Sequence, residues 1–412
     1  MANLLLKNIG LLATPTGSAA RRGAEQGEIT LLKNAYVLVK DGVIAAVGSG
    51  EVPAGMPENA EAVDVKGRLV TPGLVDAHTH LIFGGWRQNE LGLKLHGVTY
   101  LEILARGGGI LSTVRATRAA SEEELADKAA KELSAMLRMG VTTCEAKSGY
   151  GLDPENEYKQ LRAIRRLNET QKVELIPTFL GAHALPEEFK NDREGFLSLL
   201  CGEMIPTVAR EHLAEFCDVF CETGVFTAQE SRRILEAGKK YGLTPKIHAD
   251  EIDPIGGSQL AGEIGAITAE HLIVCPEEGI ASMAKGGTIA CLLPATSFYL
   301  GATFAPARAM IDAGVAVAVA TDFNPGSCPS SNLQLAMNIA CLKYRLTPEE
   351  VLTAVTLNGA AGIRRADRIG SVEVGKQGDL LVWDAPDLDY ICYRLGSNLV
   401  DTVIKKGEIV QF

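Results

Sequence analysis

Residues 74–81 read Leu-Val-Asp-Ala-His-Thr-His-Leu, a short apolar run that ends in two histidines separated by one residue. On a β-strand alternate side chains lie on the same face, so His78 and His80 are expected to point the same way, about 7 Å apart along the backbone. Polar residues at the carboxyl end of an apolar strand are typical of parallel α/β sheets, where chemistry takes place at that end. The fold therefore depends on how many further strands of this kind follow.

Seven more apolar runs follow this stretch, and amphipathic stretches separate them. Eight strand–helix units in about 250 residues predict a (β/α)8 barrel, a TIM barrel of the α/β class. A doubly wound sheet is the alternative, but no glycine-rich phosphate-binding fingerprint follows the first strand. The eight strands are expected at Leu74–Leu81, Val141–Ala146, Val173–Leu180, Val219–Glu222, Pro245–Ala249, Ile267–Val274, Thr288–Leu293 and Val315–Ala320.

The sequence also marks where several helices begin and end. A serine or threonine followed three residues later by glutamate predicts a capping box at a helix start. This pattern occurs at Ser121 with Glu124, Thr227 with Glu230, and Thr347 with Glu350. A glycine between a helical run and the next strand supplies the left-handed conformation that ends a helix. Such glycines are Gly140, Gly242 and Gly314.

The two ends of the chain read as β-strands and turns. Asp41-Gly42 between two apolar runs predicts a hairpin, and the last 40 residues contain similar short runs. We therefore expect a small β-sandwich domain built from residues 1–70 and 366–412, beside a catalytic barrel of residues 71–365. Thr14–Glu28, rich in Gly, Ala and Arg, is expected to be an exposed loop between two strands, far from the site.

Composition narrows the class of protein. The 412 residues are 46% hydrophobic and 22% charged, as in an ordinary soluble enzyme. The formal charge of −11 argues against a nucleic-acid partner. The longest apolar stretch, near Gly314–Ala320, is too short for a membrane span, and no signal peptide is recognisable, so a cytoplasmic location is expected. The nine cysteines are expected to be buried reduced thiols.

Further histidines and acids follow the later strands. His248 ends the fifth predicted strand with Glu251 three residues on, His271 ends the Thr-Ala-Glu-His of the sixth, and Asp322 follows the eighth. A lone histidine is more often packed than ligating, but His-X-His at a strand end with more candidates downstream favours a metal. His78, His80, His248 and Asp322 supply three nitrogens and one carboxylate, a set that suits zinc or iron and not magnesium or calcium.

These residues carry a resemblance to a known family. Asp76-Ala-His-Thr-His after Leu69-Val-Thr-Pro-Gly-Leu, with the later histidines and Thr-Asp, resembles the amidohydrolase superfamily over nearly the whole chain. Four further motifs resemble the imidazolonepropionase family, hydrolases of histidine degradation. They are Lys147-Ser-Gly-Tyr-Gly-Leu, Phe179-Leu-Gly-Ala-His-Ala, His248-Ala-Asp-Glu and Thr321-Asp-Phe-Asn-Pro-Gly-Ser.

The resemblance implies a role for each matched residue. His78, His80, His248 and Asp322 match the ligands of a single ion, Glu251 the group that takes a proton from the attacking water, and His271 a second polar catalytic group. Arg87 matches a contact to the substrate carboxylate. The remaining substrate contacts are Tyr150, His183, Asn324, Gly326 and Ser327. The implied reaction opens the cyclic amide of 4-imidazolone-5-propanoate and yields N-formimidoyl-L-glutamate.

Other functions stay open at this stage. Another cyclic-amide hydrolase or a deaminase on the same barrel would share the ligand set, although the motifs at Lys147 and Asn324 favour the first interpretation. An inactive scaffold would be expected to lack ligands, and none is missing. Lys147, at a strand end, could carry a carboxylate that bridges two ions, but we expect a solvated or paired lysine. Zinc and iron are equally suited, and a homodimer is expected from base rates.

Overall fold

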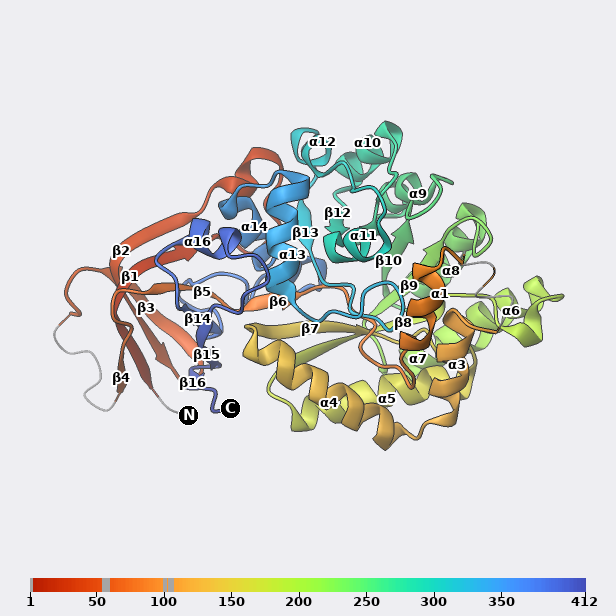
Figure 1. The fold of residues 1–412 in the computed structure, drawn as a ribbon, viewed down its shortest axis with the longest axis horizontal. Coiled ribbons are helices and arrows are strands. Elements are labelled where there is room, and N and C mark those ends of the chain that lie inside the picture. The colour runs from red at the N-terminus through yellow and green to blue at the C-terminus, as the bar shows by residue number, and fades with distance from the viewer. Residues whose placement is uncertain (1–2, 54–59, 99–101, 103–106) are drawn as a thin grey trace.

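The computed structural model describes residues 3–53, 60–98, 102 and 107–412, and within them the strands form two eight-stranded sheets (Figure 1). One is entirely parallel and runs in the order β13-β12-β11-β10-β9-β8-β7-β6, so each strand pairs with the next along the chain. Each of the eight predicted barrel strands has a counterpart, but the first ends at Asp76 and not at Leu81, so His78 and His80 lie just beyond it. The eight strands are β6 (Leu74–Asp76), β7 (Val141–Lys147), β8 (Glu174–Ala182), β9 (Phe216–Cys221), β10 (Thr244–Ala249), β11 (Thr268–His271), β12 (Ile289–Leu292) and β13 (Val317–Val319).

Contacts just beyond the first and last strands close this sheet into a barrel. Thr79 forms a parallel bridge with Phe323, and the backbone N–H of Asp322 donates to the carbonyl of His78 at 3.1 Å. The Asp76 carboxylate adds to the closure, since it accepts from the N–H of Thr321 at 3.0 Å and from its hydroxyl at 2.6 Å. The predicted (β/α)8 barrel is therefore confirmed, and its closure brings the site residues of β6 beside those that follow β13.

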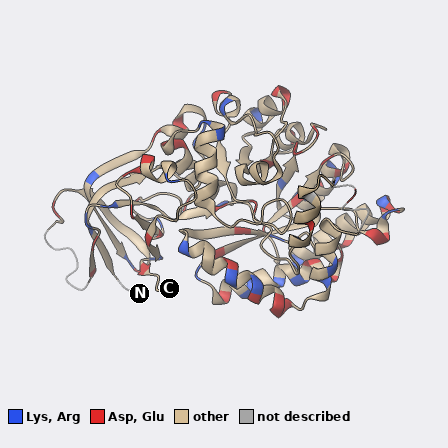
Figure 2. Cartoon of the chain, in the orientation of Figure 1, with Lys and Arg blue, Asp and Glu red and all other residues tan. Residues whose placement is uncertain are grey.

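Helices surround the barrel, and many of their residues are charged (Figures 1 and 2). Serine or threonine caps the three helices predicted to have capping boxes, and all three boxes are present. Gly140, Gly242 and Gly314 have the predicted positive φ, at 95°, 86° and 85°. The helices are α1 (Leu91–Leu95), α3 (Ile110–Ala119), α4 (Glu122–Arg138), α5 (Pro154–Thr170), α6 (Arg193–Leu199), α7 (Ile205–Arg210), α8 (Ala228–Lys240), α9 (Gly257–Ile264), α10 (Glu277–Gly286), α11 (Pro294–Leu300), α12 (Ala307–Asp312), α13 (Leu333–Ile339), α14 (Pro348–Ala354), α15 (Leu357–Gly362) and α16 (Leu388–Tyr393). In the described part of the chain, no helix combines the length and apolar character that a membrane crossing requires.

The second sheet is mixed and combines both ends of the chain, as predicted. Its order is β16-β15-β14-β5-β1-β2-β3, with β4 also paired to β1. The Trp383 indole is fully buried and donates to the Thr71 hydroxyl at 2.8 Å, which ties the C-terminal strands to the N-terminal ones. The strands are β1 (Leu4–Thr14), β2 (Thr30–Lys40), β3 (Val43–Ser49), β4 (Glu61–Asp64), β5 (Leu69–Pro72), β14 (Leu380–Trp383), β15 (Val400–Lys405) and β16 (Glu408–Ile409).

The expectation for Thr14–Glu28 is partly wrong. Much of the segment is exposed, but it contains a short 3₁₀ helix, Gly23–Gly27, whose Gln26 is fully buried. The Gln26 side chain accepts from the backbone N–H of Val317 at 2.9 Å and donates to the carbonyl of Glu350 at 3.3 Å. Val317 begins β13, so the segment is anchored at the amino end of the barrel, opposite the end that carries the site residues. A polar side chain that satisfies buried backbone groups left no apolar signal in the sequence.

Candidate metal centre and catalytic site

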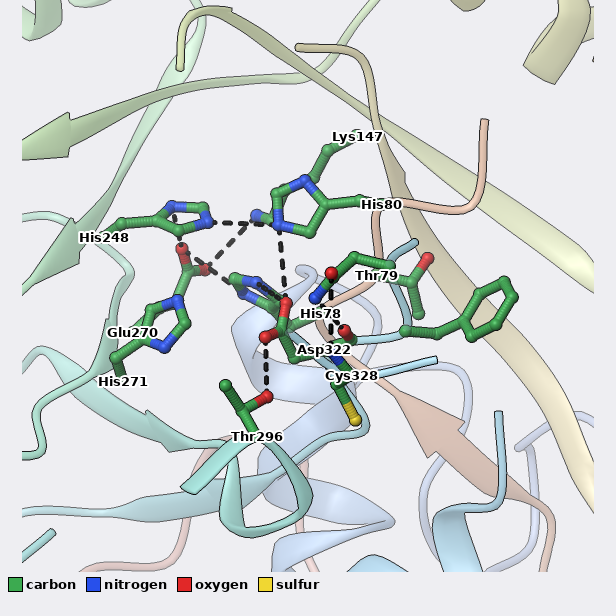
Figure 3. Close-up of polar contacts among 12 residues, drawn as sticks. His78, Thr79, His80, Lys147, His248, Glu270, His271, Thr296, Asp322 and Cys328 are labelled. Atoms are coloured by element: carbon green, nitrogen blue, oxygen red, sulfur yellow. Dashed lines mark hydrogen bonds and ion pairs between the residues drawn. The ribbon is translucent and has the colours of Figure 1, made fainter. Parts of the chain in front are cut away.

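The residues predicted to hold a metal meet at the carboxyl end of the barrel. His78 and His80 follow β6, His248 lies in β10, and Asp322 follows β13. Their exposed fractions are 3% or less. Figure 3 shows their side chains converging from these separate strands. The fold thus brings together four predicted residues that are far apart in the sequence.

The donor atoms of this set lie close together. Nε2 of His78 and Nε2 of His80 lie 3.3 Å and 3.5 Å from Oδ1 of Asp322. Nε2 of His80 also lies 3.3 Å from Nε2 of His248. Four ligands at about 2.0–2.1 Å around a tetrahedral ion would be separated by roughly 3.3–3.4 Å. These three separations match the spacing of ligands around a tetrahedral transition-metal ion, and His78, His80 and Asp322 together form one candidate metal-binding group.

Unpartnered buried atoms support the same fit. His78 Nε2 and Asp322 Oδ1 are buried and have no hydrogen-bond partner among the described residues. Buried polar atoms are rarely left in this state unless an ion or a water occupies the space between them. His271 belongs to the same cluster, because it forms a possible ligand triad with His78 and His248. The donor set of imidazoles and one carboxylate suits zinc or iron.

Asp322 is held in a fixed orientation and kept ionised. Its Oδ2 accepts from the Thr296 hydroxyl at 2.6 Å, which leaves Oδ1 turned toward the imidazoles. Burial opposes ionisation, but the nearby imidazoles of His78 and His271 and the Thr296 hydroxyl outweigh it and lower the pKa of Asp322 to about 2. Asp322 also has a φ of 55°, and His271 at the end of β11 has a φ of 70°. Left-handed backbone in residues other than glycine is strained and clusters at functional sites.

Glu251, the predicted proton acceptor, lies at the edge of this cluster. Its Oε2 is 3.7 Å from Nε2 of His271. Burial, together with the Asp322 and Glu222 carboxylates, raises the pKa of Glu251 to about 8. The buried Glu222 carboxylate accepts from the backbone N–H of Ile252 at 2.8 Å and of Asp253 at 3.1 Å. Glu222, which the sequence interpretation overlooked, therefore fixes the loop that carries Glu251.

His183 and Tyr150 lie beside His80. The His183 and His80 rings are stacked with centroids 4.8 Å apart, and the Tyr150 ring lies 5.3 Å from His183. Burial and the neighbouring His248 lower the pKa of His183 to about 3. The carbonyl of Gly149 lies 3.0 Å from His183 Nδ1 and can only accept, so Nδ1 carries the proton. The neutral ring therefore presents Nε2 as an acceptor.

Arg87 and the loop after β13 meet at a second place near the site. The Arg87 guanidinium lies against the Cα of Gly326, and its buried Nε has no hydrogen-bond partner in the described part of the chain. Asn324 organises this loop, since its Oδ1 accepts from the N–H groups of Gly326 at 2.8 Å and Ser327 at 2.7 Å. Its amide nitrogen donates to the Ser327 hydroxyl at 2.9 Å. The structure thus brings these predicted substrate-binding residues together and shows what orders their loop.

Lys147 and Cys328 lie outside the ligand set. Lys147 is paired and not solvated, because its side chain is fully buried among carboxylates. Cys328 is buried, and burial together with Asp322 raises the pKa of its thiol to about 12, which excludes a ready nucleophile. Besides Glu222, the sequence interpretation missed Glu145, Asp218, Lys246 and Glu270. Charged residues within otherwise apolar strands were the available signal, and Lys246 stands two residues before His248 on β10.

Comparisons with known proteins identify the family of this chain. A model of the amidohydrolase family matches residues 69–410. The imidazolonepropionase of Alkaliphilus metalliredigens is 52% identical over 100% of this chain and 98% of its own length. That of Bacillus cytotoxicus is 50% identical over 99% of this chain and 97% of its own. The chain therefore belongs to the amidohydrolase family of hydrolases and, within it, to the imidazolonepropionases.

Solved structures support the fold at a greater distance. An adenosine deaminase from Xanthomonas campestris with bound zinc has a TM-score of 0.72 and 20% identity, covering 99% of this chain and 92% of its own. An N-isopropylammelide isopropylaminohydrolase from Burkholderia multivorans has a TM-score of 0.71 and 19% identity, covering 100% and 98%. At this identity the likeness establishes the shared architecture alone.

Proposed function

We propose that this protein hydrolyses the cyclic amide of 4-imidazolone-5-propanoate to N-formimidoyl-L-glutamate, a step of histidine degradation, with one zinc or iron ion per chain. The observation that carries the proposal is the convergence of His78, His80, His248 and Asp322 beside a carboxyl group of raised pKa. The choice of substrate rests on the full-length relatives named imidazolonepropionase.

His78, His80, His248 and Asp322 would hold the ion. When bound, such an ion lowers the pKa of water toward about 7 and polarises a carbonyl oxygen. The Thr296 hydroxyl keeps Asp322 in place as an ionised ligand. These side chains are nearly closed to solvent, which strengthens their electrostatic influence on the reacting groups.

Glu251 is the proposed proton acceptor. The attacking water forms a bond to the ring carbonyl carbon and gives a proton to the Glu251 carboxylate. As the ring C–N bond breaks, Glu251 returns the proton to the leaving nitrogen. A raised pKa suits this exchange, because the carboxyl group must both accept and release a proton near neutral pH.

His271 and His183 take different roles in this scheme. His271 lies beside Glu251 and can donate to the oxygen on which charge develops. His183 carries its proton on Nδ1 and presents Nε2 as an acceptor, so it can bind an N–H of the substrate ring but cannot donate to the carbonyl oxygen. We therefore assign the polarisation of the carbonyl to His271.

Arg87 is the proposed partner of the propanoate. Its buried Nε has no hydrogen-bond partner among the described residues, and a guanidinium can bind a carboxylate through two parallel hydrogen bonds. Tyr150, Asn324, Gly326 and Ser327 complete the proposed substrate contacts. Of these, Asn324 acts through the loop that it orders.

A single ion is proposed because of Lys147. Its Nζ lies 2.8 Å from Glu145 Oε1 and 2.8 Å from Asp218 Oδ2. A carboxylated lysine would place a third negative group against these two carboxylates in a buried place, which is costly. The ammonium form, by contrast, neutralises them. We therefore propose that Lys147 stays a cation and bridges no second ion.

Turnover of purified, metal-loaded protein tests the proposal. The assay compares 4-imidazolone-5-propanoate with another cyclic amide and with an aminopurine, and identifies the products by mass spectrometry. Formation of N-formimidoyl-L-glutamate as the preferred product is expected. Preference for the aminopurine would indicate a deaminase, and preference for the other cyclic amide a hydrolase of different specificity. A homodimer, the absence of a nucleic-acid partner and a cytoplasmic location stay sequence-based proposals.

A further inference from the structure

A group of five charged side chains lies beneath the proposed metal ligands, and every member is completely buried. We call it the basal ion network. Three of its members are carboxylates and two are lysines, and they come from four of the barrel strands. They are Glu145 and Lys147 of β7, Asp218 of β9, Lys246 of β10 and Glu270 of β11.

The two lysines bind the carboxylates from the inner side. Lys246 Nζ lies 2.7 Å from Glu145 Oε1 and 3.2 Å from Glu270 Oε1. Lys147 Nζ contacts Glu145 and Asp218 at 2.8 Å each and Glu270 Oε1 at 3.5 Å. Thr268 donates its hydroxyl to the same Glu270 oxygen at 2.8 Å. These contacts occupy Oε1 of Glu270 and leave its Oε2 for other partners.

That second oxygen faces two of the proposed metal ligands. Glu270 Oε2 lies 3.5 Å from His78 Nδ1 and 3.3 Å from His248 Nδ1. Asp218 approaches the same His248 nitrogen, with Oδ2 at 3.1 Å and Oδ1 at 3.2 Å. Figure 3 shows Glu270 between the two rings, on the side away from Asp322. The carboxylates therefore face Nδ1 of each ring, while Nε2 of His78 faces Asp322 and Nε2 of His248 faces His80.

We propose that Glu270 and Asp218, held by Lys147 and Lys246, are positioning residues that fix the imidazoles of His78 and His248 with Nδ1 protonated and Nε2 directed at the metal. The inference rests on the metal site of the proposed function but not on its substrate. A carboxylate that accepts from the distal nitrogen of a ligand histidine fixes the ring orientation and tautomer and makes the ring a better ligand. Asp218 makes such a contact to His248 Nδ1 at 3.2 Å. Glu270 Oε2 lies within ion-pair distance of Nδ1 of both rings, and neither this oxygen nor His78 Nδ1 has a hydrogen-bond partner among the described residues.

The two lysines compensate the charge of the carboxylates and also hold Glu270 in place. Without them, three carboxylates would lie in a buried region with no lysine to compensate their charge, which is costly. The ammonium groups also hold Oε1 of Glu270, so that the carboxylate plane, and with it Oε2, cannot turn away from the rings. Loss of either lysine is therefore expected to affect metal binding, although neither is a ligand.

Zinc affinity of the metal-free protein tests this inference, measured by competition with a chromophoric chelator. Glu270→Gln keeps the size of the side chain but removes its charge. Lys246→Met removes the ammonium group that contacts Glu270 Oε1. Each is expected to weaken zinc binding by about 10-fold to 100-fold. The matched control is Lys405→Met, because Lys405 is another buried lysine, paired with Asp379 at 2.7 Å in the terminal sheet. It is expected to lower stability and leave zinc affinity unchanged.

Two results would overturn the inference. One is wild-type zinc affinity in Glu270→Gln and Lys246→Met. The other comes from the wild-type protein, so it does not depend on whether a variant folds. Nitrogen-15 NMR of labelled histidines in the zinc-loaded protein is expected to show His78 and His248 protonated on Nδ1 and metal-bound through Nε2, and the opposite arrangement in either ring would refute the proposal. Neither experiment uses the substrate, so failure of the proposed reaction is distinguishable from failure of this inference.

Discussion

The guanidinium of Arg87 lies directly on the Cα of Gly326, so closely that a β-carbon at position 326 would come within 1.0 Å of Nη2. Gly326 follows β13, and Arg87 lies beyond β6, so this contact spans the place where the barrel closes. The absence of a side chain at residue 326 is what lets the proposed substrate-binding arginine occupy its position.

Gly326→Ala is therefore expected to displace Arg87. We expect KM for 4-imidazolone-5-propanoate to rise by about 10-fold to 100-fold, the value of a lost hydrogen bond to a charged group. Metal content is expected to stay unchanged in elemental analysis. Gly92→Ala is the control, because no atom of the described residues lies within 4 Å of a β-carbon there. An unchanged KM in Gly326→Ala would show that Arg87 does not bind the substrate from this position.

Arg87→Ala is expected to weaken kcat/KM by about 2–4 kcal/mol, since the propanoate loses its charge-assisted hydrogen bonds in a partly dry place. Arg87→Lys is expected to recover only part of this, because lysine supplies the charge without the planar fork. The comparison substrate is an imidazolone without the carboxylate. Wild type and Arg87→Ala should turn it over at similar, low rates. Equal damage to both substrates would mean that Arg87 holds its loop and not the substrate.

Glu251→Gln removes the proposed proton acceptor while keeping its size. We expect kcat to fall by a factor of about 10² to 10⁴. Metal content is expected to be unchanged, because Glu251 is not a proposed ligand. Steady-state kinetics together with metal analysis measure both quantities. Near-normal turnover would instead mean that another group accepts the proton, and His271, which lies 3.7 Å from Glu251, would be the first candidate.

The raised pKa of Glu251 also predicts how the stability of the metal-free protein changes with pH. The folded protein keeps this proton up to about pH 8, whereas the unfolded chain releases it near the ordinary value of 4.5. Between these values the folded state binds more protons, so the free energy of unfolding contributed by Glu251 falls as pH rises, by at most about 1.4 kcal/mol per pH unit.

Urea unfolding of metal-free wild type and Glu251→Gln between pH 5 and 8 measures this contribution. Several histidines of the site also titrate, so the difference between the two proteins is the informative quantity. The variant is expected to gain stability relative to wild type as pH rises. A difference that stays constant with pH would contradict the raised pKa.

The barrel and its proposed ligands could be predicted from sequence because each depends on local patterns. The alternation of side chains along a strand predicted that His78 and His80 point the same way. Capping boxes such as that of Thr227 marked helix starts. The convergence of His248 and Asp322 on them followed from the topology, since parallel strands bring their carboxyl ends to one rim.

The basal ion network and the anchoring of Gln26 could not be predicted in the same way. Each depends on pairs far apart in the chain, such as Lys246 with Glu145 and Gln26 with Val317. A charged or polar residue in a buried place becomes favourable only when its partner is present. One strand read alone does not reveal that partner, so Lys147 could be described only as solvated or paired.

Metal reconstitution tests the central claim, a single-ion hydrolase, most directly. Metal-free protein is titrated with zinc or iron(II), while formation of N-formimidoyl-L-glutamate from 4-imidazolone-5-propanoate is followed. The account predicts that activity rises in proportion to added metal and reaches its maximum at about one ion per chain. A maximum at two ions per chain, or turnover that is complete without metal, would contradict it.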